Sequence, residues 1–288
     1  MIASALTLAQ ALGCVPRERA EDKDRNISAA PAAKPDRNTQ PAPQAGAVSD
    51  QAGAPETVAK APSAPPSPSP ELATSGAGAA SVPGDPLITE IFRDDFNRAG
   101  EARAELGPNW RATSPRWQIS DGRLCGDGVR NHPLWLARRL PKNAIVEFTA
   151  TSASTEGDIK AEFWGDGQSA ARGQSYTDAT SYLTIFGGWQ NRFHVLARID
   201  EHAPDRREIK LVPGAADFKL SAVVPNQVYH FQVERRDGHT VRWLVDDMEI
   251  LTYRDENPLT GQGHEHFGFN DWQVRVCFDD LRVTPLQD

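Results

Sequence analysis

The stretch Val228-Tyr-His-Phe-Gln-Val-Glu-Arg-Arg-Asp-Gly-His-Thr-Val-Arg-Trp-Leu-Val-Asp-Asp-Met-Glu-Ile-Leu-Thr-Tyr253 decides the fold of this chain. Apolar and polar residues alternate in three segments of it, and a period of two is that of a β-strand. Asp237-Gly238 between the first two segments predicts a hairpin turn, because glycine adopts positive φ without steric cost. Asp246-Asp247 predicts a second tight turn. The stretch therefore predicts three consecutive antiparallel strands.

Five further segments show the same alternation, and sustained helical periodicity is absent from the sequence. These segments are 145–150, 158–164, 181–186, 192–199 and 274–278. Many short strands joined by Gly, Pro and Asp turns are typical of two packed antiparallel sheets. We therefore predict an all-β fold, a two-sheet antiparallel sandwich.

The aromatic residues separate the chain into two parts. All 7 Trp, 4 Tyr and 11 Phe lie between Phe92 and Phe278. Residues 15–86 consist mainly of Ala, Pro, Ser and Gly, and such a segment buries too little apolar surface to offset the entropy of ordering it. The sequence predicts a disordered Pro/Ala-rich linker over 15–86 and one globular domain over 87–288.

Residues 1–14 form a short apolar run that ends in Ala11-Leu-Gly-Cys14. This ending resembles a bacterial lipobox, in which the cysteine is lipidated. The run is shorter than the roughly 20 residues that span a bilayer, and its length suits a signal peptide. We expect export, with Cys14 carrying a lipid that anchors the protein in the membrane of the cell envelope. The alternatives are a cleaved signal peptide with secretion and a cytosolic leader.

The net charge of the chain limits the classes of molecule that it can be expected to bind. The chain has 31 Lys and Arg against 39 Asp and Glu, a formal net charge of −8. Nucleic acids and anionic lipids require a basic face, so we expect neither as the main partner. Beyond Cys14 the sequence contains Cys125 and Cys277, which are compatible with one disulfide in an exported protein. The sequence leaves open whether they are bonded or remain separate thiols.

Several motifs resemble the concanavalin A-like lectin and glucanase jelly roll, in the branch of the 3-keto-disaccharide hydrolase domains and laminin-G-like modules. They are Trp117–Leu124, Arg236–Asp246, Phe267-Gly-Phe269 and Val276–Val283. The resemblance covers nearly all of 87–285 and implies an opening strand, Ile91–Phe96, beside the closing strand. This fold hosts lectins, glycosidases, lyases and adhesion modules, so the resemblance implies a fold more firmly than an activity.

Alternation along 159–164, 182–186 and 194–200 assigns one set of side chains to the outer face of a sheet. Together with the loop 187–191, this set mixes aromatic rings with polar groups, as sugar-binding clefts do. The alternative is that its aromatic members cover a second hydrophobic layer or a partner surface. We expect the following residues to contact an oligo- or polysaccharide: Trp164, Tyr182, Trp189, Asn191, His194 and Arg198.

Glu162 and Asp200 are expected in the same cleft as acceptors for sugar hydroxyls. In an enzyme they would form the catalytic carboxylate pair, which glycosidases hold roughly 5 Å or 6.5–9.5 Å apart. The Glu-x-Asp-x-x-Glu pattern of jelly-roll glucanases is absent, and Glu156-Gly-Asp-Ile-Lys-Ala-Glu162 only approximates it. Three functions stay open: carbohydrate recognition, glycoside hydrolysis or elimination, and a surface adhesion or structural role.

Four aspartates form a candidate calcium site, because hard cations bind clustered carboxylates. Asp94 and Asp95 lie in the opening strand, and Asp279 and Asp280 lie in the closing strand expected beside it. The alternative is that all four are bulge and turn residues with water or arginine partners. His264-Glu-His266 places two histidines on one side of an extended segment, as metal ligands are, but the sequence identifies no further ligand.

Overall fold

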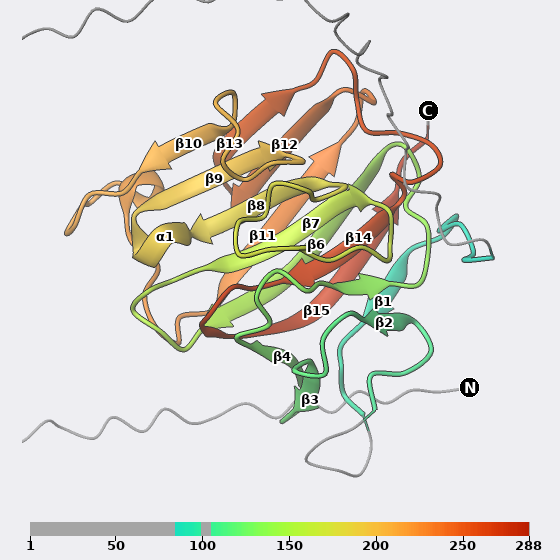
Figure 1. Cartoon of the computed structure of the whole chain (residues 1–288), viewed down its shortest axis with the longest axis horizontal. Coiled ribbons are helices and arrows are strands. Elements are labelled where there is room, and N and C mark those ends of the chain that lie inside the picture. Colours follow the sequence, from blue (N-terminus) through green and yellow to red (C-terminus); the bar gives the residue numbers. More distant parts are fainter. Residues whose placement is uncertain (1–83, 99–104, 288) are drawn as a thin grey trace, which may run out of the picture. The chain divides into compact units, whose positions relative to one another are not determined.

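The computed structural model describes residues 84–98 and 105–287. The predicted signal peptide, Cys14 and the predicted linker up to residue 83 lie outside this part of the chain. The described residues form two layered antiparallel sheets, a jelly-roll sandwich (Figure 1), and the predicted all-β fold is confirmed. None of the helices in the described ranges is long and apolar enough to cross a membrane.

The eight-stranded sheet has the order β13-β12-β11-β6-β15-β4-β3, with β1 paired to β15. Its strands are β1 (Phe92–Asp94), β3 (Gln118–Ser120), β4 (Arg123–Asp127), β6 (Ala144–Ser152), β11 (Tyr229–Arg235), β12 (Thr240–Val245), β13 (Met248–Arg254) and β15 (Arg275–Pro285). The predicted three-stranded stretch forms one edge of this sheet. Asp246 and Asp247 both take positive φ, 49° and 62°, as a tight hairpin turn requires. The opening strand pairs with the closing strand as expected, with Phe92 opposite Val283.

The seven-stranded sheet has the order β10-β9-β8-β7-β14-β5-β2. Its strands are β2 (Trp110–Ala112), β5 (Leu134–Leu136), β7 (Ile159–Gly165), β8 (Tyr182–Gly187), β9 (Phe193–Arg198), β10 (Arg207–Lys210) and β14 (His266–Asn270). A single turn, α1 (Gly188–Asn191), joins β8 to β9, and a short 3₁₀ turn, η1 (Phe218–Leu220), follows β10. The strands β2, β5, β10 and β14 of this sheet, like β3 and β4 of the other, lie outside the segments predicted from alternation, because three to five residues are too few to display it.

The core between the sheets is largely aromatic. The ring of Phe148 stacks on that of Phe231, with centroids 5.0 Å apart, and meets the rings of Phe267 and Phe269 at 6.0 and 5.2 Å. Such rings each bury a large apolar area and gain from offset or edge-to-face packing. This cluster joins both sheets into one core.

Cys125 and Cys277 are bonded to each other, which answers the question that the sequence left open. They are direct cross-strand partners in β4 and β15, with Cα atoms 4.1 Å apart. The bridge closes a sequence separation of 152 residues and fixes β4 against β15.

For most of β7, the prediction of which side chains point into the core and which point to the outer face is correct. Ile159, Ala161 and Phe163 lie in the core between the sheets, and Lys160 lies on the opposite face. The prediction is wrong for Trp164, whose side chain is fully buried in the core. A register shift in the pairing with β14 and a φ of 56° at Trp164 turn its side chain inward.

The predicted faces are wrong for β8 and β9, because Tyr182 and His194 are fully buried in the core. The Tyr182 hydroxyl donates to Asp255 at 2.7 Å, and the His194 ring stacks on Phe186 with centroids 4.1 Å apart. The residues expected in the core form a second apolar cluster on the outer face: Leu183, Ile185, Val195 and Ala197. Both faces of these strands are buried, so alternation of polar and apolar residues does not distinguish them.

Candidate functional site

A long connection, here called the cover loop (residues 166–180), joins β7 to β8 and lies over the outer face of the seven-stranded sheet. Its Tyr176 and Ala179 pack on the second apolar cluster. Its backbone is tied to other segments: the Ala171 N–H donates to the Asn131 carbonyl at 2.9 Å, and the Glu201 N–H donates to the Tyr176 carbonyl at 3.1 Å. The cover loop therefore shields part of the outer face of the seven-stranded sheet from solvent.

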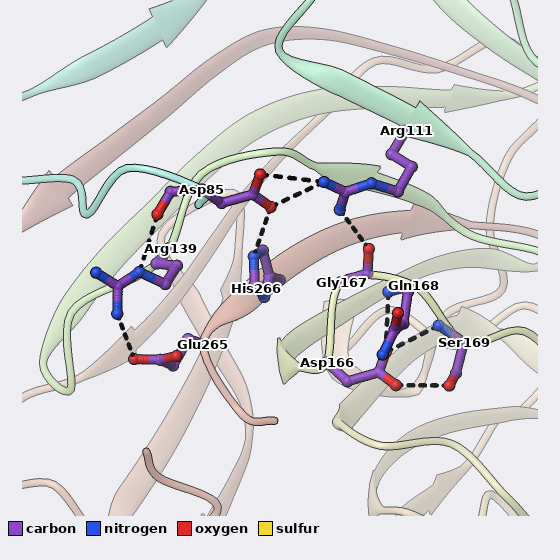
Figure 2. Close-up of polar contacts among 9 residues, drawn as sticks. All are labelled: Asp85, Arg111, Arg139, Asp166, Gly167, Gln168, Ser169, Glu265 and His266. Atoms are coloured by element: carbon purple, nitrogen blue, oxygen red, sulfur yellow. Dashed lines mark hydrogen bonds and ion pairs between the residues drawn. The ribbon is translucent and has the colours of Figure 1, made fainter. Parts of the chain in front are cut away.

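The beginning of the cover loop is fixed by a polar cluster around Asp85 (Figure 2). Arg111 donates two hydrogen bonds to the Asp85 carboxylate, at 2.9 and 3.1 Å, and one to the carbonyl of Gly167 at 2.7 Å. Arg139 donates to the Asp85 carbonyl at 3.0 Å and to Glu265 at 3.2 Å. Arg111 thus links the first described residues of the domain to the cover loop.

The two histidines that resembled metal ligands hold this same loop. His266 is fully buried, its Nε2 lies 3.1 Å from Asp85, and burial lowers its pKa. A Cβ atom on Gly167 would lie 2.5 Å from the His266 ring, so only glycine fits there. His264 Nδ1 lies 2.7 Å from the carbonyl of Thr180, at the other end of the cover loop.

Glu162 lies on the outer face of β7 beneath the cover loop and is fully buried. Its carboxylate accepts hydrogen bonds from Tyr176 at 2.9 Å, Ser181 at 2.6 Å and Asn270 at 2.7 Å. Burial raises the pKa of Glu162 to about 7, although the three hydrogen bonds oppose this rise. These contacts give Glu162 a structural role under the loop.

Lys160 lies two residues before Glu162 and forms a buried ion pair. Its Nζ donates to Glu201 at 2.8 Å and to Asn131 at 2.7 Å. Burial disfavours the ammonium charge, but the carboxylates of Glu201 and Asp158 raise the pKa of Lys160 overall. The lysine is therefore a fixed positive charge at physiological pH.

A cavity of about 360 Å³ opens beside this ion pair. Its floor includes Lys160 of β7 and Ile185 of β8, and its walls come from the turn before β7, the cover loop, α1 with Arg192, the turn after β9 and the segment after β14. Trp189 and Trp272, both half-buried, supply aromatic surface. The charged and imidazole side chains that line it are Glu156, Asp158, Lys160, Arg192, Glu201 and His202. Aromatic surface with convergent polar groups is the composition of a small-ligand site.

Trp189 is presented by an unusual turn. Trp189, Gln190 and Asn191 have φ values of 53°, 60° and 59°, a left-handed conformation that is strained for residues with a Cβ. The Asn191 side chain holds the turn: it donates to the carbonyls of Thr155 and Val223 at 3.0 and 2.8 Å and accepts from the Val223 N–H at 2.8 Å. The Arg206 guanidinium lies 4.7 Å from the centroid of the Trp189 ring.

Of the residues that the sequence assigned to the cleft, Trp189 alone lines this cavity. Asn191 supports the turn, and Arg198 donates to Asp255 at 2.8 Å. Asp200 accepts a hydrogen bond from the His202 N–H at 2.7 Å and, like Glu162, is not part of the lining. Sequence reasoning missed Trp272, although a tryptophan directly after the polar end of β14, Asn270-Asp271, is a signal for a functional loop.

The four aspartates of the predicted calcium site lie near the pairing of β1 with β15. Asp94 is occupied by other partners, since it accepts two hydrogen bonds from Arg98 and one from Trp110 Nε1, at 2.7–2.8 Å. Burial alone would raise the pKa of Asp94, but these donors lower it. Within the described ranges no three His, Cys, Asp or Glu side chains are grouped to hold a metal. Calcium binding stays a prediction.

No family model matches the sequence, and no curated protein matches it. Solved structures are similar to it. A carbohydrate-binding module, CBM66 of Bacillus subtilis, has 15% identity and a TM-score of 0.44 over 61% of this chain and 95% of that one. The alginate lyase Aly36B has 12% identity and a TM-score of 0.47 over 69% and 98%. The β-glucanase of Bacillus licheniformis has 10% identity and a TM-score of 0.46 over 69% and 100%.

Proposed function

We propose that this domain recognises a carbohydrate in the cavity beside the cover loop. The observation that carries the proposal is the meeting of Trp189 and Trp272 with charged side chains in one open cavity of about 360 Å³. Indole rings stack on pyranose faces, and fixed carboxylates and amines orient hydroxyl groups. The strained turn at Trp189 supports the proposal, because backbone strain concentrates at functional sites.

Binding of the chain to an array of bacterial, plant and algal glycans tests the proposal. Trp189→Ala and Trp272→Ala should each weaken binding of the retained glycan at least tenfold, which corresponds to about 1.4 kcal/mol. Phe92→Ala, which removes a half-buried ring from β1 in the other sheet, is the matched control and should bind like the unmodified chain. A folded chain that retains no glycan on the array would overturn the proposal.

Turnover of the bound glycan is a second candidate function. Its support is that two carboxylates, Asp158 and Glu201, line the cavity together with Lys160. Glu162 and Asp200, the pair expected from the sequence, lie outside the lining of this cavity. Release of reducing ends or of unsaturated products by the unmodified chain, abolished in Glu201→Gln, would establish hydrolysis or elimination; binding without product would leave recognition alone.

We also propose that the chain is exported and anchored through lipidated Cys14. The apolar run of residues 1–14 supports this proposal, and so does the bond between Cys125 and Cys277, because disulfides persist in oxidising compartments. Expression in bacteria with a labelled fatty acid tests it. Label should enter the membrane-bound chain and should be lost in Cys14→Ser; an unlabelled chain in the soluble fraction would contradict it.

A further inference from the structure

Asp158 stands apart from the other charged residues of the cavity. It is 8% exposed, it lines the cavity, and no described residue donates a hydrogen bond to its carboxylate. Buried carboxylates are ordinarily paired or hydrogen-bonded, because an isolated buried charge is costly. The carboxylate of Asp158 is therefore available to a ligand that enters the cavity.

The backbone fixes Asp158 in this position. Gly157 and Asp158 have φ values of 71° and 70°, and the Asp158 N–H donates to the carbonyl of Gly187 at 3.1 Å. A Cβ atom at Gly157 would lie 2.5 Å from that carbonyl oxygen, so the turn depends on glycine. Aspartate tolerates the left-handed conformation better than most residues, and here that conformation places the Asp158 side chain in the lining of the cavity.

The charges around Asp158 do not balance. Lys160 is the cation on the cavity floor, and its ammonium already pairs with Glu201 at 2.8 Å and with Asn131 at 2.7 Å. Lys160 is the cation that lowers the pKa of Asp158 and Glu201 is the carboxylate that raises it, so two carboxylates share one ammonium there, while Arg192 also lines the cavity. Burial raises the pKa of Asp158, as expected for a carboxylate whose charge is not fully compensated.

A ligand that matches this arrangement carries a small positive group beside a ring. An acidic sugar would bring like charge to the two carboxylates, and a neutral sugar would leave the extra charge uncompensated. A protonated amine on a pyranose would pair with the carboxylate while the ring stacks on Trp189 or Trp272. We infer that the cavity selects glycans with a free, protonated amino group, and that Asp158 binds this ammonium. The inference rests on the proposed carbohydrate recognition.

Sets of oligosaccharides that share a backbone and differ in one substituent test the inference. The first set is β1,4-linked glucosamine, N-acetylglucosamine and glucose hexamers, measured against the full chain by calorimetry at pH 6. Galactosamine oligomers and their acetylated and hydroxyl counterparts form the second set. The amine form of at least one set should bind at least tenfold more tightly than its counterparts.

Asp158→Asn should abolish this preference, and asparagine keeps the left-handed backbone that the turn needs. Asp247→Asn, at the β12–β13 turn of the other sheet, is the matched control and should keep the preference. Equal or weaker binding of the amine forms in both sets overturns the inference. If another glycan then binds in the cavity, the proposal of carbohydrate recognition is still supported. Absence of binding to these sets and to the glycan array overturns both.

Discussion

The carboxylate of Asp85 lies 3.1 Å from Nε2 of His266, across a sequence separation of 181 residues. Arg111 completes this contact with two hydrogen bonds to the same carboxylate and one to Gly167 (Figure 2). The first described residues of the domain, the strand β14 and the cover loop are thereby tied together. Because the cover loop supplies one wall of the cavity, this cluster stabilises the candidate site from outside it.

Arg111→Ala should loosen the cover loop. It removes three hydrogen bonds, two of them to a carboxylate, and we expect a loss of about 1–3 kcal/mol in the free energy of unfolding. Amide exchange in residues 167–180 should accelerate, and glycan binding should weaken a few-fold. Hydrogen-exchange mass spectrometry measures this. Arg111→Lys should behave like Arg111→Ala, because one ammonium does not reach both the Asp85 carboxylate and the Gly167 carbonyl as the two terminal guanidinium nitrogens do; full rescue by lysine would contradict this role.

Glu162 should make stability depend on pH. Its folded-state pKa of about 7 lies above the ordinary value of 4.5, so the folded protein keeps a proton that the unfolded chain releases. This stabilisation is complete below about pH 4.5 and is lost as the pH rises through 7, a change of about 3 kcal/mol. Urea unfolding of Glu162→Gln should lack this part of the decline between pH 5 and 8. Glu256→Gln, at an exposed position, should retain it, and equal slopes in all three proteins would disprove the assignment.

Asn191 should govern the position of Trp189. Asn191→Ala removes three side-chain hydrogen bonds and puts a less tolerant residue at a φ of 59°, so we expect a loss of about 2–3 kcal/mol and weaker glycan binding. Asn191→Gly removes the same hydrogen bonds, but glycine adopts the positive φ of this position without strain. Thermal unfolding of the two variants separates the contributions. Unchanged binding in both would show that the turn does not position Trp189.

The bond between Cys125 and Cys277 should contribute substantially to stability. Replacing both cysteines with serine removes the cross-link between residues 152 positions apart in the sequence. The unfolded chain then gains conformational entropy, and the free energy of unfolding should fall by about 2–5 kcal/mol. The unmodified chain with excess reductant should unfold at the same urea concentration as this double variant. A double variant as stable as the oxidised chain would count against the bond.

The sequence determined the fold class and the strands of six or more residues. Alternation in Tyr229–Arg235 and Thr240–Val245, with Asp237-Gly238 between them, encodes local geometry, and the resulting hairpin is present. That the opening strand lies beside the closing strand followed from resemblance to a known fold, and in the structure Phe92 pairs with Val283. These features depend on residues near in sequence or on a recognised pattern.

The tertiary structure alone decided which residues form the candidate site. A prediction from alternation assumes that one face of each strand is exposed to solvent. The cover loop buries the outer face of β8 and β9, so both faces carry apolar residues, and Tyr182 and His194 lie in the core. The cavity combines Asp158, Glu201 and Trp272 from segments that the sequence separates widely. Their proximity depends on strand order and on loops packed by long-range contacts, and no local period in a sequence encodes either.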